Sequence, residues 1–348
     1  MTYDFRSDNV APPMAELLGA ALRNGTGWMD AYGEDSTTAQ VEELLAGIFE
    51  HEVAAFPILT GTAANALALA QLSNRFGQIL CHRSSHIYLD ECGAVEFHNP
   101  GGRLIPLDGG DGKLDVDRCA RVISAADDVH QLRFTALSIS QATEMGTCYS
   151  AGEVEKLAAL AKRNGMAVHM DGTRFANVVA ASEASPADLT WRSGVDVLCL
   201  GATKGGAMGA EVVLFFDRHQ ARDFRRLMKR SGHLPSRMWF LAAQLQASFK
   251  GGLWLESARH SNAMAARLGT ALEAGYAIVP YHPVQTNMVF LKMDRAPCDR
   301  LRQEGFNFYT VGDEKDGILA RLVTSHATQP HDVDRLADAI GNAVRGVA

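Results

Sequence analysis

The sequence has no long apolar run. No window of about 18 uncharged apolar residues occurs among its 348 residues, so we expect no membrane-spanning helix and no membrane partner. The first ten residues, MTYDFRSDNV, carry charges and no apolar core segment, so we expect neither a secretory signal nor a transit peptide. Basic residues are outnumbered, with 33 Lys and Arg against 40 Asp and Glu. A net charge of −7 argues against nucleic acid as a partner, because proteins that bind it usually present a basic face.

Cysteine is scarce and follows no motif. Six cysteines are spread over the chain, and none forms a C-x-x-C pair. A chain of this length buries enough apolar surface to need no disulfide or metal. We therefore expect buried thiols in a reducing compartment, the cytoplasm. The sequence also lacks internal repeats, and it lacks a G-x-G-x-x-G motif after a strand, which argues against a nicotinamide enzyme.

Strand and helix patterns alternate over the first two thirds of the chain. Strand patterns lie at 52–58, 78–81, 103–106, 133–139, 166–170, 195–201 and 211–216, and helix patterns at 37–50, 59–72, 115–126 and 151–164. Such alternation is typical of an α/β fold with a mostly parallel sheet. Thr62 is the expected cap of the helix at 59–72.

The pattern changes after about residue 217. Long helix patterns are followed by short strands and a final helix, at 217–230, 237–274, 287–293, 318–323 and 331–345. At about 150 residues per domain the chain is long enough for two domains. We expect an N-terminal arm and large domain over residues 1–250 and a smaller α+β domain over 251–348.

Lys204 stands between two apolar strand patterns, VDVLCLGA and EVVLFF. A lysine in this position either reaches past the loop to solvent or is buried, and burying an unpaired charge is costly. Burial also disfavours the protonated amine, and an unprotonated lysine is a nucleophile toward carbonyl groups. Position alone leaves both interpretations open.

Two further features lie near strand ends, where ligands bind in open α/β sheets. Asp171 follows the apolar run MAVHM, where it can cap the next helix or keep the ring nitrogen of a cofactor protonated. The segment TGTAAN at 60–65 enters a helix through a glycine turn, and free N–H groups there suit a phosphate. A phosphate-binding helix start, an aspartate and then a lysine is the order expected of a pyridoxal phosphate (PLP) enzyme with the aspartate aminotransferase fold.

At the level of motifs, the chain resembles the low-specificity L-threonine aldolases, and especially the bacterial branch with DECGA, QATE and TKNG-type motifs. The matching motifs run from SDN (7–9) through AYGEDSTT (31–38), LTGTAAN (59–65), SSHIYLDECGA (84–94), ISQATEMG (139–146), HMDGTRF (169–175), GVDVLCLGATKGG (194–206) and FNFYT (306–310) to ARLVTS (320–325). The resemblance implies an α/β, PLP-dependent, aspartate aminotransferase-like fold. It also implies retro-aldol cleavage of β-hydroxy-α-amino acids, such as threonine, to glycine and an aldehyde.

The resemblance further implies which residues form the site. Those that it assigns to the cofactor are Lys204 as the covalent attachment, Asp171 at the ring nitrogen, His86 stacked on the ring, Gly61 and Thr62 at the phosphate, Arg174, and Lys229 and Arg237 approaching the phosphate across a subunit interface. Those that it assigns to the substrate are Ser7, Arg174 and Arg321 at the carboxylate, with Glu91 and Glu144 on the hydroxyl side. The candidates for the base that removes the hydroxyl proton are His86, Glu91 and a bound water.

Three positions differ from the usual motifs of that family. Glu144 stands where many members have histidine, Thr173 interrupts the usual DGAR, and Gly205 follows the lysine where asparagine is common. These differences leave PLP binding intact. They bear on the substrate range and on the configuration accepted at Cβ.

Other functions fit parts of the pattern. β-Elimination, racemisation and transamination can run on the same PLP scaffold. Alternatively, His82 and His86, four residues apart, with Glu91 nearby, suggest a metal-dependent hydrolase, although the HExxH glutamate is missing. The basic run RDFRRLMKR at 222–230 is typical of a solvated helix face. We expect no metal, a small amino acid as substrate, and a homodimer or homotetramer with active sites at the interface.

Overall fold

Apolar strands form a 7-stranded sheet at the centre of the molecule, in the order β2-β8-β7-β6-β5-β3-β4. The computed structural model describes residues 3–74, 76–126, 128–311 and 317–346. The strands of this sheet are β2 (Ala54–Ile58), β3 (Gly77–His82), β4 (Arg103–Leu107), β5 (Arg133–Ser140), β6 (Ala167–Gly172), β7 (Val197–Gly201) and β8 (Glu211–Phe215). Strands β3 to β7 pair in parallel, whereas β8 is antiparallel to both of its neighbours. The prediction of a mostly parallel sheet is confirmed.

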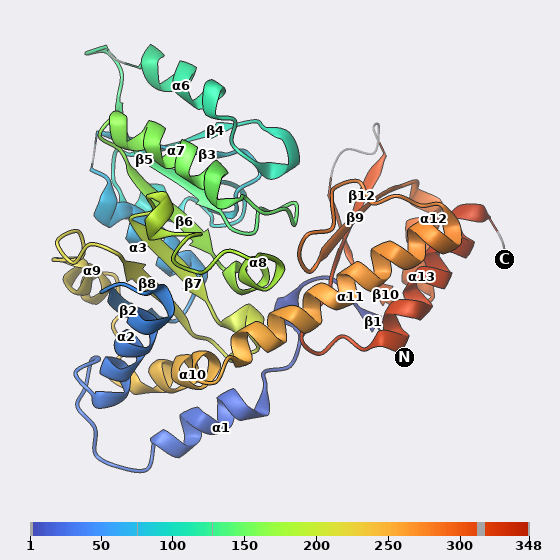
Figure 1. Cartoon of the computed structure of the whole chain (residues 1–348), viewed down its shortest axis with the longest axis horizontal. Coiled ribbons are helices and arrows are strands. Elements are labelled where there is room, and N and C mark those ends of the chain that lie inside the picture. The colour runs from blue at the N-terminus through green and yellow to red at the C-terminus, as the bar shows by residue number, and fades with distance from the viewer. Residues whose placement is uncertain (1–2, 75, 127, 312–316, 347–348) are drawn as a thin grey trace.

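Helices cover both faces of this sheet (Figure 1). The helices of this part of the chain are α1 (Ala15–Asn24), α2 (Ser36–Phe49), α3 (Gly61–Leu72), α4 (His86–Leu89), α5 (Ala94–His98), α6 (Val116–Ala125), α7 (Ala151–Arg163), α8 (Phe175–Ala181), α9 (Phe224–Arg230) and α10 (Trp239–Phe249). Of these, α1 packs on α10 and lies away from the sheet. A helix between successive parallel strands returns the chain to the same end of the sheet, so the carboxyl ends of the strands gather at one edge.

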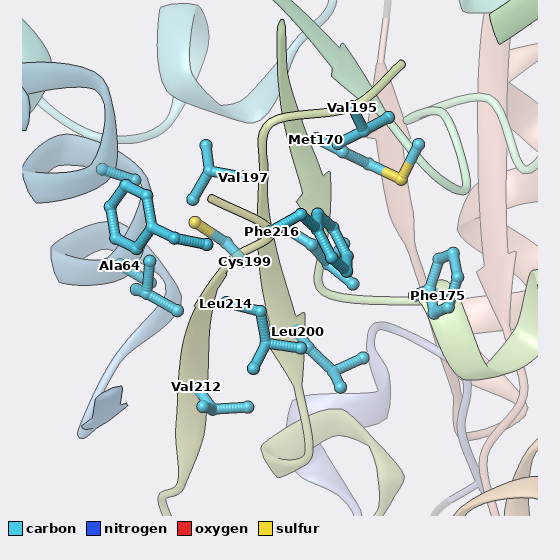
Figure 2. Close-up of a cluster of buried hydrophobic side chains, with 14 of the residues drawn as sticks. Ala64, Met170, Phe175, Val195, Val197, Cys199, Leu200, Val212, Leu214 and Phe216 are labelled. Carbon is cyan, nitrogen blue, oxygen red and sulfur yellow. The ribbon is translucent and has the colours of Figure 1, made fainter. Parts of the chain in front are cut away.

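Side chains of the central strands alternate between the two faces. In Figure 2, Val197 and Cys199 lie on the side of Ala64 in α3, whereas Phe175 of α8 lies on the other side. The ring of His169 lies 3.3 Å from the sulfur of Cys199, and so it also faces α3. Side chains two residues apart in a strand share a face. Asp171, two residues after His169 in β6, therefore points toward α3 as well.

Three helix boundaries differ from the predicted ones. Thr60, and not Thr62, caps α3, because its extended backbone lets its hydroxyl accept the N–H of Ala63. The pattern at 217–230 becomes a helix only from α9 onward. The pattern at 237–274 is two helices, α10 and α11 (Leu253–Tyr276), because Gly251 and Gly252 turn the chain with φ angles of 88° and 86°.

A second hydrophobic core lies in the C-terminal part of the chain. Its elements are the later turns of α11, β9 (Met288–Met293), α12 (Arg295–Gln303), β10 (Phe306–Asn307), β12 (Ile318–Val323) and α13 (Pro330–Arg345). The exposed strand β11 (Tyr309–Val311) pairs with β12. Tyr3 and Phe5 pack into this core, and β1 (Tyr3–Asp4) pairs with β10. The change from the first core to the second falls within α11, and the division at residue 250 stays a prediction.

Two expectations concern the whole chain. No helix of the described ranges is long and apolar enough to cross a membrane. The six cysteines are free thiols, of which Cys81, Cys119, Cys199 and Cys298 are buried, whereas Cys148 is half-buried and Cys92 is exposed. The expectation of buried thiols is therefore wrong for Cys92.

The packing of α13 on α11 gives a prediction about stability. A Cβ on Gly341 would overlap the ring of Tyr276, which is fixed by a 2.7 Å hydrogen bond to Asp338 and by Arg345 over its face. We expect Gly341→Ala to lower the free energy of unfolding by about 1–3 kcal/mol through overpacking. A Cβ on Gly275, in the last turn of α11, meets nothing, so Gly275→Ala should instead stabilise by up to about 1 kcal/mol. The measurement is the melting temperature of each variant. If both substitutions shifted it in the same direction, the result would contradict this packing.

Candidate functional site

Two of the predicted site residues lie at neighbouring strand ends. Asp171 is the second-last residue of β6, and Lys204 lies in the 3-10 turn Thr203–Gly205 after β7. β6 and β7 are parallel neighbours, so both residues lie at the same edge of the sheet. The alternative interpretation of Asp171 as a helix cap is wrong, because α8 begins only at Phe175.

Asp171 is 5% exposed, and hydrogen bonds reach both of its carboxylate oxygens. Oδ1 accepts from the backbone N–H and the hydroxyl of Thr173, at 3.1 and 2.6 Å, and Oδ2 accepts from Nδ2 of Asn65 at 3.0 Å. Burial opposes the charge, but the Thr173 hydrogen bonds and the nearby charges of His86 and Lys204 outweigh it. They hold the pKa of Asp171 below its usual value. The carboxylate is therefore ionised at neutral pH, which a partner of a cationic ring nitrogen requires.

His86 and Glu91 form a pair that is joined to Asp171 through Asn65. Nδ1 of His86 donates to Oε1 of Glu91 at 2.8 Å, and the same oxygen accepts from Nδ2 of Asn65 at 2.9 Å. Burial raises the pKa of Glu91, and the hydrogen bond to Glu91 raises the pKa of His86. The Glu91 side chain is 0% exposed and that of His86 is 33% exposed, so the histidine is the member of the pair that reaches the open side.

Lys204 is half-buried at the edge of a small cavity. Thr173, Asn287 and Ser325 line the same cavity, so it lies between the large sheet and the C-terminal part of the chain. Burial and the positive charge of Arg174 lower the pKa of the Lys204 amine. A lowered pKa increases the fraction of unprotonated amine, which is the nucleophilic form.

An ion pair that the sequence analysis does not identify holds Arg174. Asp8 accepts from Nε and Nη2 of Arg174, at 2.8 and 2.9 Å, and from Nδ2 of Asn287 at 3.1 Å. Burial opposes the charge of Asp8, but Arg174 and Lys204 lower its pKa to about 2. Two guanidinium nitrogens of Arg174 are thus engaged, and only Nη1 is left for the predicted contact with a ligand. Ser7, predicted to bind the substrate carboxylate, lies next to Asp8 and caps the 3-10 turn that contains it.

Arg321 lies on β12, which is the middle strand of the sheet β11-β12-β9. Arg321 therefore does not lie on an edge strand of this sheet. Nη1 of Arg321 donates to the backbone oxygen of Arg6 at 3.3 Å, and among the residues that the structure describes no carboxylate lies within ion-pair distance. Burial and the charge of Arg174 lower the pKa of this guanidinium, while Glu144 and Asp8 oppose that shift. A half-buried guanidinium without a carboxylate partner suits an anionic ligand.

The predicted phosphate-binding segment is the first turn of α3. The backbone N–H groups of Gly61 and Thr62 have no acceptor in the described parts of the chain. They lie at the positive end of a 12-residue helix, which suits an anion. A Cβ on Gly61 would lie 3.6 Å from Oγ1 of Thr173, the hydroxyl that bonds Asp171. The helix start and Asp171 therefore belong to one site.

Lys229 and Arg237 lie apart from this site within the chain. Nζ of Lys229 lies 4.3 Å from the ring centroid of Tyr32, and Arg237 is exposed just before α10. In the described parts of the chain, no contact joins either residue to the strand-end residues. Their predicted approach to a phosphate stays a prediction.

The alternative of a metal site finds no support. His82 ends β3, whereas His86 begins α4, so the two do not share a helix. The ring nitrogens of His82 lie 2.7 Å from Oγ of Ser84 and 3.2 Å from the backbone oxygen of Gly109. Within the described ranges, no group of three or more His, Cys, Asp or Glu side chains is placed to hold a metal ion.

Glu211 is a buried acid that the sequence analysis does not identify. It is 5% exposed on β8, directly opposite Gly201, and its Oε2 accepts from the backbone N–H of Ala202 at 3.1 Å. Burial raises the pKa of Glu211 to about 7, against the attraction of Lys204. The turn that carries Lys204 is therefore anchored on a carboxyl group that titrates near neutral pH.

Asn65 and Asp8 are also missed by the sequence analysis. Each stands inside a motif that carries the family resemblance, TGTAAN for Asn65 and SDN for Asp8. A buried polar side chain needs a partner. The apolar neighbours of Asn65 in AANALALA are the one signal in the sequence that points to such a partner.

The chain is similar to known proteins over nearly its whole length. Residues 4–296 match the family described as Beta-eliminating lyase. The chain is 37% identical to the low specificity L-threonine aldolase of Pseudomonas sp. (strain NCIMB 10558), over 97% of this chain and 96% of the relative. A threonine aldolase structure from Leishmania major matches with a TM-score of 0.92 and 28% identity, over 99% of this chain and 100% of that one. An aspartate aminotransferase from Rhodobacter sphaeroides, at 18% identity, matches with a TM-score of 0.73 over 99% and 94% of the two chains. The predicted fold class is confirmed.

The pKa of Glu211 gives a prediction about the pH dependence of stability. Its value of about 7 in the folded protein exceeds the usual 4.5, so the folded protein holds one more proton than the unfolded chain between these pH values. The stability that this group contributes is complete below pH 4.5 and is lost as the pH rises through 7. We expect the stability of the wild type, relative to that of Glu211→Gln, to fall by up to about 3 kcal/mol over this interval.

The measurement is urea unfolding of the cofactor-free enzyme between pH 4.5 and 8. Glu155→Gln, an exposed position on α7, is the matched control, and its free energy of unfolding should depend on pH as that of the wild type does. If the free energy of unfolding of Glu211→Gln also follows the wild type at every pH, then Glu211 is ionised in the folded protein across the whole range.

Proposed function

Because this chain belongs to the low-specificity L-threonine aldolases of the beta-eliminating lyase family, we propose that it cleaves L-threonine and L-allo-threonine to glycine and acetaldehyde. Related β-hydroxy-α-amino acids such as phenylserine are substrates in the same proposal. The observation that carries it is the meeting of Lys204 and an ionised Asp171 at neighbouring strand ends. It is joined by a half-buried Arg321 near Arg174 that pairs with no carboxylate of the described chain.

Enzymes of this family use PLP, and the residues present fit this cofactor. Buried oxygens of Asn65 and Glu91 have no partner in the described residues, which is expected where a bound group completes the hydrogen bonding. Lys204 would hold PLP covalently, and Asp171 would accept from its ring nitrogen. Gly61 and Thr62 would donate to its phosphate, and His86 would stack on its ring. When bound, PLP supplies an electron sink for the electron pair released as the Cα–Cβ bond breaks.

The substrate carboxylate belongs, in this proposal, to Arg321. Its guanidinium lacks a carboxylate partner among the described residues, whereas Arg174 already gives two nitrogens to Asp8. Arg174 then contributes through Nη1, with Ser7 beside it. A bidentate guanidinium contact orients the amino acid and selects the L configuration at Cα.

His86 is the group that we assign to the substrate hydroxyl. Its Nδ1 is fixed by Glu91, and no described residue lies within hydrogen-bond distance of its Nε2. Nε2 of the neutral ring can accept the hydroxyl proton, directly or through a water, and the Glu91 carboxylate stabilises the resulting imidazolium. Glu91 then orients the base, because its own side chain is buried behind the histidine.

We also propose a homodimer or homotetramer in the cytoplasm. Lys229 and Arg237 would reach the phosphate of a neighbouring subunit. Large apolar side chains that a subunit interface would cover support this assembly, among them Leu22, Trp28, Leu59, Phe97 and Met208. The six free thiols suit a reducing compartment.

The activity is tested by product analysis on separate isomers. We expect L-threonine and L-allo-threonine to differ by less than about 100-fold in kcat/KM, because one hydrogen bond at Cβ contributes only about 1 kcal/mol. D-Threonine should not be cleaved. Release of 2-oxobutyrate and ammonia would indicate β-elimination instead, accumulation of D-isomers would indicate racemisation, and a 2-oxo acid without free ammonia would indicate transamination.

The assignment of Arg321 is tested by Arg321→Leu. Loss of a charge-assisted hydrogen bond costs about 1.5–3 kcal/mol, which is about 10- to 150-fold in kcat/KM. The visible absorbance of bound PLP should be unchanged, because the guanidinium serves the substrate. Arg163→Leu, an exposed position at the end of α7, is the control. Loss of PLP from Arg321→Leu would assign this arginine to the cofactor.

A further inference from the structure

Among the residues that the structure describes, Asn65 is the one whose hydrogen bonds reach both Asp171 and Glu91. Its Nδ2 donates to Oδ2 of Asp171 at 3.0 Å and to Oε1 of Glu91 at 2.9 Å, and the side chain is 1% exposed. These contacts cross three segments: α3, the turn after α4, and β6. The chain of contacts continues to His86 through its 2.8 Å bond to Glu91.

The orientation of this amide follows from its two neighbours. Nδ2 carries two protons and gives one to each carboxylate, whereas Oδ1 in the same place would face two acceptors and repel both. Oδ1 is buried on the other side without a partner in the described residues. Asn65 thus donates a hydrogen bond to each acid, while its own oxygen accepts none from the described residues.

The pKa values of the two acids that share this amide are shifted in opposite directions. Burial raises the pKa of Glu91, while the pKa of Asp171 is lowered by Thr173, His86 and Lys204 against the effect of burial. Glu91 and Asp171 also repel each other, so both can be charged only if positive or donating groups separate them. The amide of Asn65 is the donating group that lies between them.

We propose that Asn65 is a positioning residue that keeps Asp171 ionised for the cofactor while it fixes Glu91 behind His86. This inference rests on the proposed function, since it takes Asp171 as the partner of the PLP ring nitrogen. Asp171 accepts hydrogen bonds from Asn65 of α3 and from Thr173 of the turn after β6. The titratable and charged groups that act on it are His86 from α4, Glu91 beyond Asn65, His169 from β6, Arg174 before α8, Cys199 from β7, Lys204 from the turn after β7 and Glu211 from β8.

Two substitutions remove the donor in different ways. Asn65→Asp keeps the size of the side chain but turns the donor into a third acceptor. Asn65→Leu keeps a similar volume but offers neither donor nor acceptor. Both should raise the pKa of Asp171, because a carboxylate without its hydrogen bond is less stable in a buried place. Asn65→Asp should have the larger effect because it adds a negative charge.

The measurement is the dissociation constant of PLP from the cofactor-free enzyme, followed by absorbance between pH 5.5 and 8.5. We expect PLP to bind both variants more weakly than the wild type. The ratio of the variant to the wild-type constant should grow as the pH falls, reaching about tenfold or more at pH 5.5, because a protonated Asp171 carries no negative charge to pair with the protonated ring nitrogen. Titrations of PLP itself cancel in this ratio.

Two further variants make the result specific. Thr173→Ala removes the hydroxyl bond to Asp171 Oδ1 but leaves the backbone N–H of residue 173 in place, so its effect should have the same sign. Asn99→Ala, a buried amide at the end of α5 outside the site, should bind PLP as the wild type does. A ratio that does not change with pH in either Asn65 variant would reduce Asn65 to a packing role and overturn the proposal.

Borohydride reduction of the wild type separates this result from a failure of the proposed function. PLP fixed on the peptide that contains Lys204, together with a flat ratio for the Asn65 variants, would overturn the inference about Asn65 alone. PLP fixed on another lysine, or on none, would overturn the proposed function, and the inference with it.

Discussion

The site depends on a buried carboxylate that must remain charged. Asp171 is almost inaccessible to water, and burial alone would favour its neutral form. The protein offsets this with hydrogen bonds from Thr173 and Asn65 and with the positive charges of His86 and Lys204. Each of these groups comes from a different segment, so the requirement for one charge constrains the start of α3, the end of β6, the turn after β7 and the position of α4.

Three carboxyl groups near Lys204 show how their surroundings separate their roles. Asp171 receives three hydrogen bonds and stays ionised. Glu91 is buried and shares one oxygen between two donors, and burial raises the pKa of Glu211 to about 7 in spite of the hydrogen bonds from Ala202 and Thr203. The acids differ little in chemistry, so the burial, donors and charges around each one decide its charge. In the proposed function, this difference allows Asp171 to hold a cationic ring while Glu91 supports His86.

The sequence predicts the parts of this site that lie on single segments. Apolar runs ending in Asp171 and Lys204 indicate strand ends, and parallel strands bring such ends to one edge, as the structure confirms. The partners of these residues are not predictable in the same way. Asn65 meets Asp171 across 106 residues and Asp8 meets Arg174 across 166, and no local pattern encodes which distant polar group will fill a buried position. The break between α10 and α11 is missed for a different reason, because the apolar spacing continues through Gly251 and Gly252 while their backbone does not.

In the proposed function, the cofactor side and the substrate side of the site are built on different sheets. Asp171 and the start of α3 stand at the edge of the large sheet, and Lys204 stands in the turn after β7. Arg321 stands on the small sheet, and the arginine near it, Arg174, is tied through Asp8 to Asn287 at the start of the second core. The proposed carboxylate contact therefore depends on how the N-terminal arm and the C-terminal strands sit on the large sheet. The arm also supports the turn that carries Lys204, because the N–H of Met14 donates to the backbone oxygen of Gly206 at 2.8 Å. A substitution in β12 can consequently change which amino acid binds without disturbing the groups that would hold PLP, whereas changes in the arm or at the sheet edge affect both.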